Sequence, residues 1–107
     1  MDISPEQMEI LGRARFVQRV AEMLVASGAV APDNDPKVLC THVANALDEA
    51  EARGIKSERL MGMYAILRLG DGVDPYAIKE YAAVLQDPSI AEDDKAHLLQ
   101  MIRIGEL

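Results

Sequence analysis

The chain of 107 residues contains little cysteine, few aromatic side chains and fewer positive than negative charges. Its one cysteine, Cys40, has no partner for an internal disulfide, and the two histidines are too far apart in sequence for a recognisable zinc-binding spacing. Eleven lysines and arginines against 18 aspartates and glutamates give a net charge of -7, with no basic run. Such a charge repels phosphates, so the composition argues against nucleic-acid binding.

Long apolar runs are also missing. The longest uncharged stretches, 23–32 and 38–47, are much shorter than the roughly 18 apolar residues that a membrane span needs. The chain begins with Met1 and Asp2, which is acidic where a secretory signal is basic, and no apolar segment follows. We therefore expect a cytoplasmic protein with no membrane segment.

Apolar residues are nevertheless abundant enough to build a core. Half of the chain is apolar (50%) and 27% is charged, which are ordinary values for a globular protein. A chain of this length hides roughly two-thirds of its unfolded surface, so it needs no disulfide or metal to fold. The length and composition predict a single domain over residues 1–107. The pattern of apolar residues, described next, predicts that this domain is helical.

Prolines, glycines and capping residues divide that pattern into helices. Ser4 and Gln7 flank a proline as in a capping box, which predicts a helix start, and apolar residues recur every three or four positions up to Ser27. Gly28 then supplies a left-handed cap. No stretch alternates apolar and polar residues over the length of a strand, so a sheet is not expected.

The middle of the chain predicts two further helices. The second covers 36–53, and we expect Ile55 to fold back toward Ala50 in a Schellman ending. The third covers 58–69, is capped by Ser57 and is apolar on nearly every side. A helix of that kind is normally central, so we expect the third helix to form the middle of the domain.

Two aspartate-proline pairs organise the last part of the chain. The pair at 74–75 predicts the start of a fourth helix, and the pair at 87–88 predicts its end. Ser89 and Glu92 have the spacing of a capping box for a fifth helix, which Gly105 ends. The predicted fold is therefore all-α, a compact bundle of about five helices.

The residue types that catalyse reactions or bind metals do not occur with a spacing typical of a catalytic or metal site. Cys40 and His42 are two positions apart on a predicted helix, so they point in different directions and do not form a nucleophile and base pair. The acidic turns at 33–35 and 71–74 lack the ligand spacing of a calcium loop, and no glycine-rich phosphate loop is present. From the sequence we therefore expect a protein that is not an enzyme and binds no metal and no cofactor.

Two groups of side chains are candidates for a protein interface. The first group combines a polarisable methionine with tyrosines whose hydroxyls favour the rim of an apolar patch: Met61, Tyr64 and Tyr76. The second group is a set of neighbouring carboxylates that we expect to form a solvated acidic face: Asp48, Glu49 and Glu51. Filling a core is the commoner use of methionine, and the methionine-rich third helix is equally compatible with an interface hidden in a homodimer.

The spacing of several short motifs resembles that of a known family. The motifs are the run 50–53, Gly54-Ile55, Ser57-Glu58, Leu69-Gly70, Val73-Asp74-Pro75, Tyr81-Ala82, Leu85, Asp87-Pro88 and Lys95. In this spacing the chain resembles a small all-helical family encoded beside type VI secretion effectors that contain PAAR domains, and beside their adaptor chaperones. It departs from the family in having Arg53 where an aromatic residue is usual and Tyr81 where tryptophan often stands.

The resemblance implies a non-enzymatic role with a protein partner in the bacterial cytoplasm. We expect an accessory or co-chaperone protein that binds an effector, or the adaptor chaperone, through the apolar patch and assists its stability or loading. The alternative is an immunity protein that blocks the basic active site of a toxin domain with an acidic surface drawn from Asp48, Glu49, Glu51, Asp93 and Asp94. Apolar binding tolerates salt, whereas binding driven by acidic groups weakens as salt rises.

Overall fold

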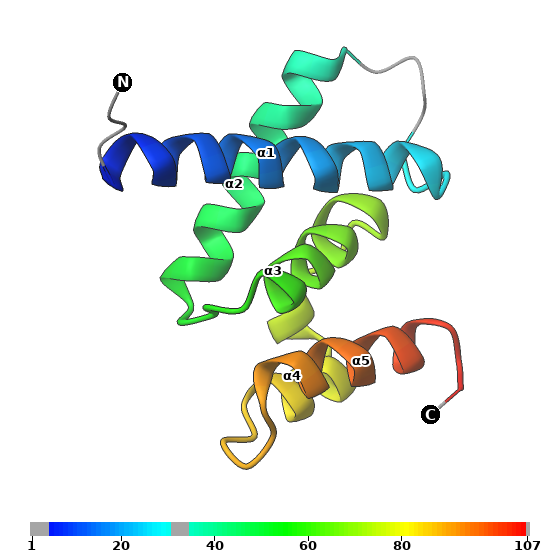
Figure 1. The fold of residues 1–107 in the computed structure, drawn as a ribbon. Coiled ribbons are helices and arrows are strands. Elements are labelled where there is room, and N and C mark those ends of the chain that lie inside the picture. Colours follow the sequence, from blue (N-terminus) through cyan, green and yellow to red (C-terminus); the bar gives the residue numbers. More distant parts are fainter. Residues whose placement is uncertain (1–4, 31–34, 107) are drawn as a thin grey trace.

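The computed structural model describes residues 5–30 and 35–106, with side chains described from Gly12 onward. Within these ranges the chain forms one compact globule of five α-helices without strands (Figure 1). The helices are α1 (Pro5–Ala26), α2 (Pro36–Ala52), α3 (Glu58–Ala65), α4 (Lys79–Leu85) and α5 (Glu92–Arg103), joined by a π-helical turn η1 (Ile66–Gly70) and a 3₁₀ turn η2 (Pro75–Ala77). The predicted all-α fold is confirmed.

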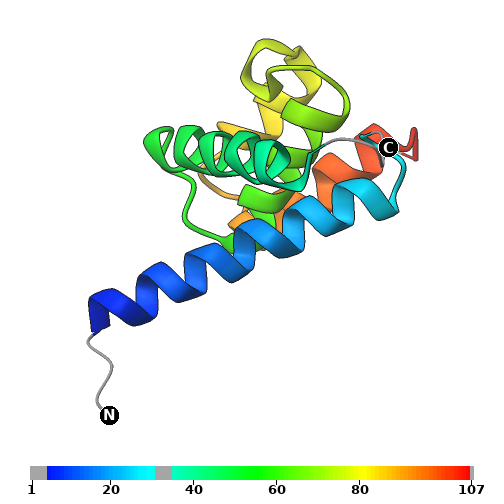
Figure 2. The same cartoon turned by 90° about the horizontal axis from the view of Figure 1, so that it is seen from above.

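Helix α1 is long, and its described buried side chains lie in its C-terminal half. Val20 and Leu24 are buried there, and Gly28 adopts a φ of 76°, which confirms the predicted left-handed cap. The N-terminal half projects away from the other helices (Figure 2). Accordingly, the radius of gyration is 14.5 Å, against about 13 Å for a compact domain of this length. The predicted cap at Ser4 lies outside the described residues.

Helix α2 begins and ends as its sequence predicts. The Asp35 carboxylate accepts a hydrogen bond from the backbone N–H of Lys37 at 2.9 Å. At the other end, the N–H of Ile55 donates to the carbonyl of Ala50 at 3.1 Å, and Gly54 has a φ of 91°. These are the features of a Schellman ending, which brings Ile55 into the core.

Helix α3 is the centre of the globule. All residues from Leu60 to Ala65 are buried, as the apolar pattern predicts. The Ser57 hydroxyl accepts a hydrogen bond from the N–H of Leu60 at 3.3 Å and caps the helix. Helices α1, α2 and α5 surround it (Figure 1), with α2 and α5 making most of the contacts to α3.

The fourth helix starts later than the Asp-Pro signal predicts. Asp74 and Pro75 open only the short turn η2, Ile78 is extended, and α4 begins at Lys79. The turn is held by groups outside α4, because Arg53 binds the Asp74 carboxylate and Pro75 is buried. The half-buried Ile78 packs against the core from its extended backbone. The predicted start at 74–75 is therefore wrong by one short turn.

The predicted capping box at Ser89 and Glu92 is also wrong. The Ser89 hydroxyl donates to the Asp87 carboxylate at 2.6 Å, and the residue at the start of α5 is Ala91, which offers no capping side chain. Glu92 does not reach back to Ser89. Its carboxylate is used in another part of the fold.

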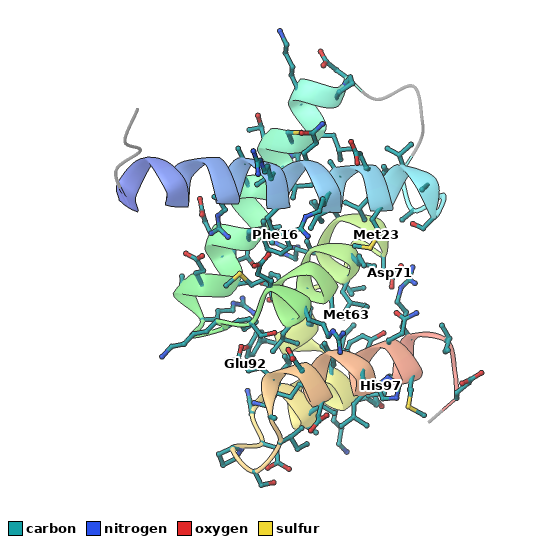
Figure 3. The ribbon with its side chains drawn as sticks, viewed as in Figure 1. Phe16, Met23, Met63, Asp71, Glu92 and His97 are labelled. Atoms are coloured by element: carbon teal, nitrogen blue, oxygen red, sulfur yellow. The ribbon has the colours of Figure 1, made fainter. Side chains whose placement is uncertain are left out.

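Glu92 joins the start of α5 to the start of α3. One of its oxygens accepts hydrogen bonds from the backbone N–H groups of Lys56, at 2.7 Å, and Ser57, at 2.8 Å. The adjacent Asp93 accepts a hydrogen bond from the Ser57 hydroxyl at 2.6 Å. Two backbone donors just before α3 are thus satisfied by α5, in a contact between segments distant in sequence (Figure 3).

We predict that Glu92→Ala lowers the free energy of unfolding by about 1–3 kcal/mol, because it leaves two backbone donors without their acceptor. Asp94→Ala is the matched control, since Asp94 is an exposed acid in the same first turn of α5 and has the same interaction with the helix dipole. Urea unfolding of both variants measures the difference. Equal losses in the two variants would show that the contact with α3 contributes nothing.

Candidate functional site

The six side chains predicted to form an interface fall into two separate clusters, each built around an arginine. The first cluster consists of Met61, Asp48 and Glu51 around Arg13. The second cluster consists of Glu49, Tyr64 and Tyr76 around Arg53. The structure therefore separates Met61 from the two tyrosines and separates Glu49 from the other two carboxylates.

The Arg13 cluster ties α1 to α2. The guanidinium lies 2.5 Å from the Glu51 carboxylate and 3.3 Å from that of Asp48, and it also contacts the Met61 sulfur at 3.8 Å. The Asp48 side chain is 71% exposed, so water screens this ion pair and its contribution to stability is small. The cluster partly neutralises the acidic face that the sequence predicts.

The Arg53 cluster ties the end of α2 to η2. The guanidinium donates two hydrogen bonds to the Asp74 carboxylate, at 2.7 and 3.0 Å. It lies 4.6 Å from the ring centroid of Tyr76 and 5.8 Å from that of Tyr64. The two rings are 6.3 Å apart and tilted. A planar cation held by a carboxylate and two rings fixes the η2 turn against α2 and α3.

Glu49 completes this cluster from the neighbouring turn of α2. It accepts a short hydrogen bond from the hydroxyl of Tyr64, which is fully buried, and another from the Arg68 guanidinium at 3.2 Å. Arg53 lies 3.8 Å away. The buried hydroxyl thereby finds a polar partner inside the protein instead of at a wet rim.

The ionisable groups of the cluster stabilise one another in their ordinary charge states. The hydrogen bond from Tyr64, with a smaller contribution from Arg68, lowers the pKa of Glu49, and the hydrogen bond from Arg53 lowers the pKa of Asp74. Burial and the Glu49 carboxylate raise the pKa of the Tyr64 hydroxyl. These shifts move each pKa away from 7, the opposite of what a general acid or base at neutral pH requires. The network is suited to holding structure.

The exposed apolar patch expected around Met61, Tyr64 and Tyr76 is not where the sequence predicts it. Met61 is 6% exposed, Tyr64 is fully buried and Tyr76 is half-buried. Met61 and Tyr64 point to faces of α3 that neighbouring helices cover, and Tyr76, on η2, packs against Tyr64 and Arg53. The sequence does not reveal which face of an all-round apolar helix lines a groove.

An open apolar groove lies on a different face of α3, between α1 and α5. Its volume is about 550 Å³. Figure 3 shows Phe16 and Met23 from α1, Met63 from α3 and His97 from α5 around it. The remaining lining residues are Arg19, Val20, Glu58, Arg59, Gly62, Ile66, Ala96 and Gln100.

The groove results from the way the neighbouring helices pack. Helix α1 packs mainly against α2, whereas α5 packs against α3 and α4, so a strip of α3 lies between them. Gly62 lies on this strip, and the nearest described atom to the place of a side chain is a methyl group of Val20, at 4.0 Å. At the rim, Met23 is 43% exposed. In the sequence, Gly62 among the apolar residues of α3 was the one signal for this groove.

The described residues include no group of three or more histidine, cysteine or acidic side chains placed to hold a metal ion. Cys40 is half-buried, and His42 and His97 are exposed on different helices. Within the same part of the chain, no helix is both long enough and apolar enough to cross a bilayer.

Comparison with known proteins gives no significant match to any family model, curated protein or solved structure. The resemblance to the family encoded beside type VI effectors therefore depends on the motifs of this chain alone.

The pKa shift of Glu49 predicts how stability depends on pH. A carboxyl with a lowered pKa in the folded state contributes stability above its unfolded pKa and loses that contribution as the pH falls through its folded pKa. We predict that Glu49→Gln lowers the free energy of unfolding by about 1 kcal/mol at pH 7, since Glu49 is partly exposed and screened. The difference from the unmodified protein should shrink between about pH 5 and pH 3.

Chemical unfolding at a series of pH values measures this effect. Asp48→Asn is the control, because it removes a largely exposed carboxylate from the adjacent position of α2, and it should change stability by less than about 0.5 kcal/mol. A Glu49→Gln variant whose stability runs parallel to that of the unmodified protein at every pH would contradict the assigned role of Glu49.

Proposed function

We propose that this protein is a non-enzymatic accessory or co-chaperone protein that binds a type VI secretion effector, or the effector's adaptor chaperone, and assists its stability or loading. The proposal is carried by one observation, the apolar groove between α1, α3 and α5. The family resemblance supplies the biological setting. In this role the protein acts in the bacterial cytoplasm on a protein partner and needs no cofactor or metal.

The shape and lining of the groove favour an amphipathic helix as the bound element. Two helices form its walls and a third forms its floor, which is the arrangement that receives a helix in a groove. Met23 and Met63 offer flexible, polarisable side chains that adapt to different apolar residues. The volume of about 550 Å³ is sufficient for a few apolar anchors from one face of a helix.

The alternative, an immunity protein, depends on a free acidic face. Asp48 and Glu51 are already paired with Arg13, and Glu49 is bound by Tyr64 and Arg68. These arginines reduce the negative potential that the predicted face offers to a basic toxin site. Asp93 accepts a hydrogen bond from the Ser57 hydroxyl, and Asp94 is exposed at the start of α5. The observations therefore favour the accessory role.

Co-purification with the products of neighbouring genes tests the proposal. We expect the protein to bring down an effector or adaptor chaperone and Met23→Glu to reduce recovery by on the order of tenfold, because it places a charge against apolar contacts. Val38→Glu is the matched control, since Val38 is a similarly exposed apolar residue on α2, outside the groove. The complex should persist at high salt.

Two results would contradict the proposal. One is equal binding by Met23→Glu and Val38→Glu, which would remove the groove from the interface. The other is recovery of an isolated toxin domain, inactivated by the protein and released as salt rises, which would support the immunity alternative.

A further inference from the structure

One exposed side chain of the apolar groove carries a sulfur atom. Among the large exposed apolar residues that the structure describes, Met23 is 43% exposed, and the others have hydrocarbon side chains: Val25, Val38 and Ile104. Of these four, Met23 alone lines the groove between α1, α3 and α5. Exposure to solvent, an oxidisable thioether and a place in the groove therefore coincide at this residue.

The other methionines whose side chains the structure describes are shielded from solvent. Met61 and Met63 are each 6% exposed, and the Met61 sulfur also lies 3.8 Å from the Arg13 guanidinium. Met101 is half-buried on α5, outside the groove. Because an oxidant dissolved in water has to reach the sulfur, Met23 is the described methionine that is most open to oxidation.

Oxidation of a thioether by a peroxide is a two-electron reaction. A lone pair of the Met23 sulfur attacks one oxygen of hydrogen peroxide, so that an S–O bond forms and the O–O bond breaks. The proton on the transferred oxygen passes to the leaving hydroxide, which departs as water. Sulfur is oxidised and the peroxide is reduced. The product, methionine sulfoxide, is polar where the thioether was apolar.

At position 23 the sulfoxide changes the groove without unfolding the protein. In the free protein the side chain is in contact with water, so the new oxygen stays hydrated. An apolar partner that covers Met23 has to remove this oxygen from water without offering it a hydrogen bond, which weakens binding. Oxidation of a buried methionine such as Met63 would instead disrupt the core.

We propose that Met23 is a site of reversible oxidation, and that its sulfoxide closes the groove between α1, α3 and α5 to apolar partners. Methionine sulfoxide reductases, each of which acts on one epimer of the sulfoxide, restore the thioether. The consequence for binding rests on the proposed function, because it concerns the same groove. The oxidation site does not, since it depends on the exposure of Met23.

Peptide mass spectrometry after timed treatment of the folded protein with hydrogen peroxide tests the site. Met23 should be converted to the sulfoxide on the order of tenfold faster than Met61 and Met63, and faster than Met101, because it is more exposed. Treatment in concentrated urea is the control, since unfolding exposes all four and should remove the difference. Equal rates for Met23, Met61 and Met63 in the folded protein would overturn the inference.

Fluorescence anisotropy tests the consequence for binding. The probe is a synthetic, fluorescein-labelled amphipathic helix with leucine at every third or fourth position, the kind of element that the groove is proposed to bind. Peroxide treatment of the protein should weaken binding by on the order of tenfold, and reductase treatment should restore it. Met23→Leu is the matched control, because it keeps an apolar side chain without a thioether and should bind equally before and after treatment. Circular dichroism should show the same helix content in treated and untreated protein.

The outcomes separate this inference from the proposed function. Equal binding of the probe before and after oxidation, or an equal loss in Met23→Leu, would overturn the inference and leave the proposed function standing. Absence of binding to the untreated protein, together with the expected oxidation rates, would contradict the groove as a binding site while confirming Met23 as the site of oxidation.

Discussion

The rest of the structure depends on the covering of one short helix, α3, that is apolar on every side. Such a helix is stable only if its neighbours remove all of its faces from water. Helix α2 covers one face, α5 covers another and α1 crosses above them. Glu92 adds a polar link to this apolar packing, because it satisfies the two backbone donors that precede α3.

The helices that cover α3 leave a groove between α1 and α5, and the candidate site follows from that. Where α1 and α5 diverge, Gly62 and Met63 form the floor of an apolar groove, with Met23 exposed at its edge. The polar clusters around Arg13 and Arg53 lie elsewhere and are satisfied within the chain. They fix α1 and η2 against α2, and the methionines of the groove have flexible side chains.

The sequence predicted the features that depend on near neighbours. The helical fold, the caps at Gly28 and Ser57 and the return of Ile55 to Ala50 are all decided within a few residues, and the structure confirms them. The capping box at Ser89 was wrong because the carboxylate three residues later binds backbone 35 residues away. The candidate site was mostly missed for the same reason, since which face of α3 lines the groove is decided by the distant helices α1 and α5.

The central claim is that a protein partner binds in the groove between α1, α3 and α5. The most direct measurement is methyl NMR of the protein labelled at its methionines, titrated with the effector or adaptor chaperone encoded beside it. The account predicts shifts or broadening of the Met23 and Met63 signals, while that of Met101, which lies on α5 outside the groove, stays unchanged. Binding that perturbs Met101 and leaves Met23 and Met63 unchanged would contradict it.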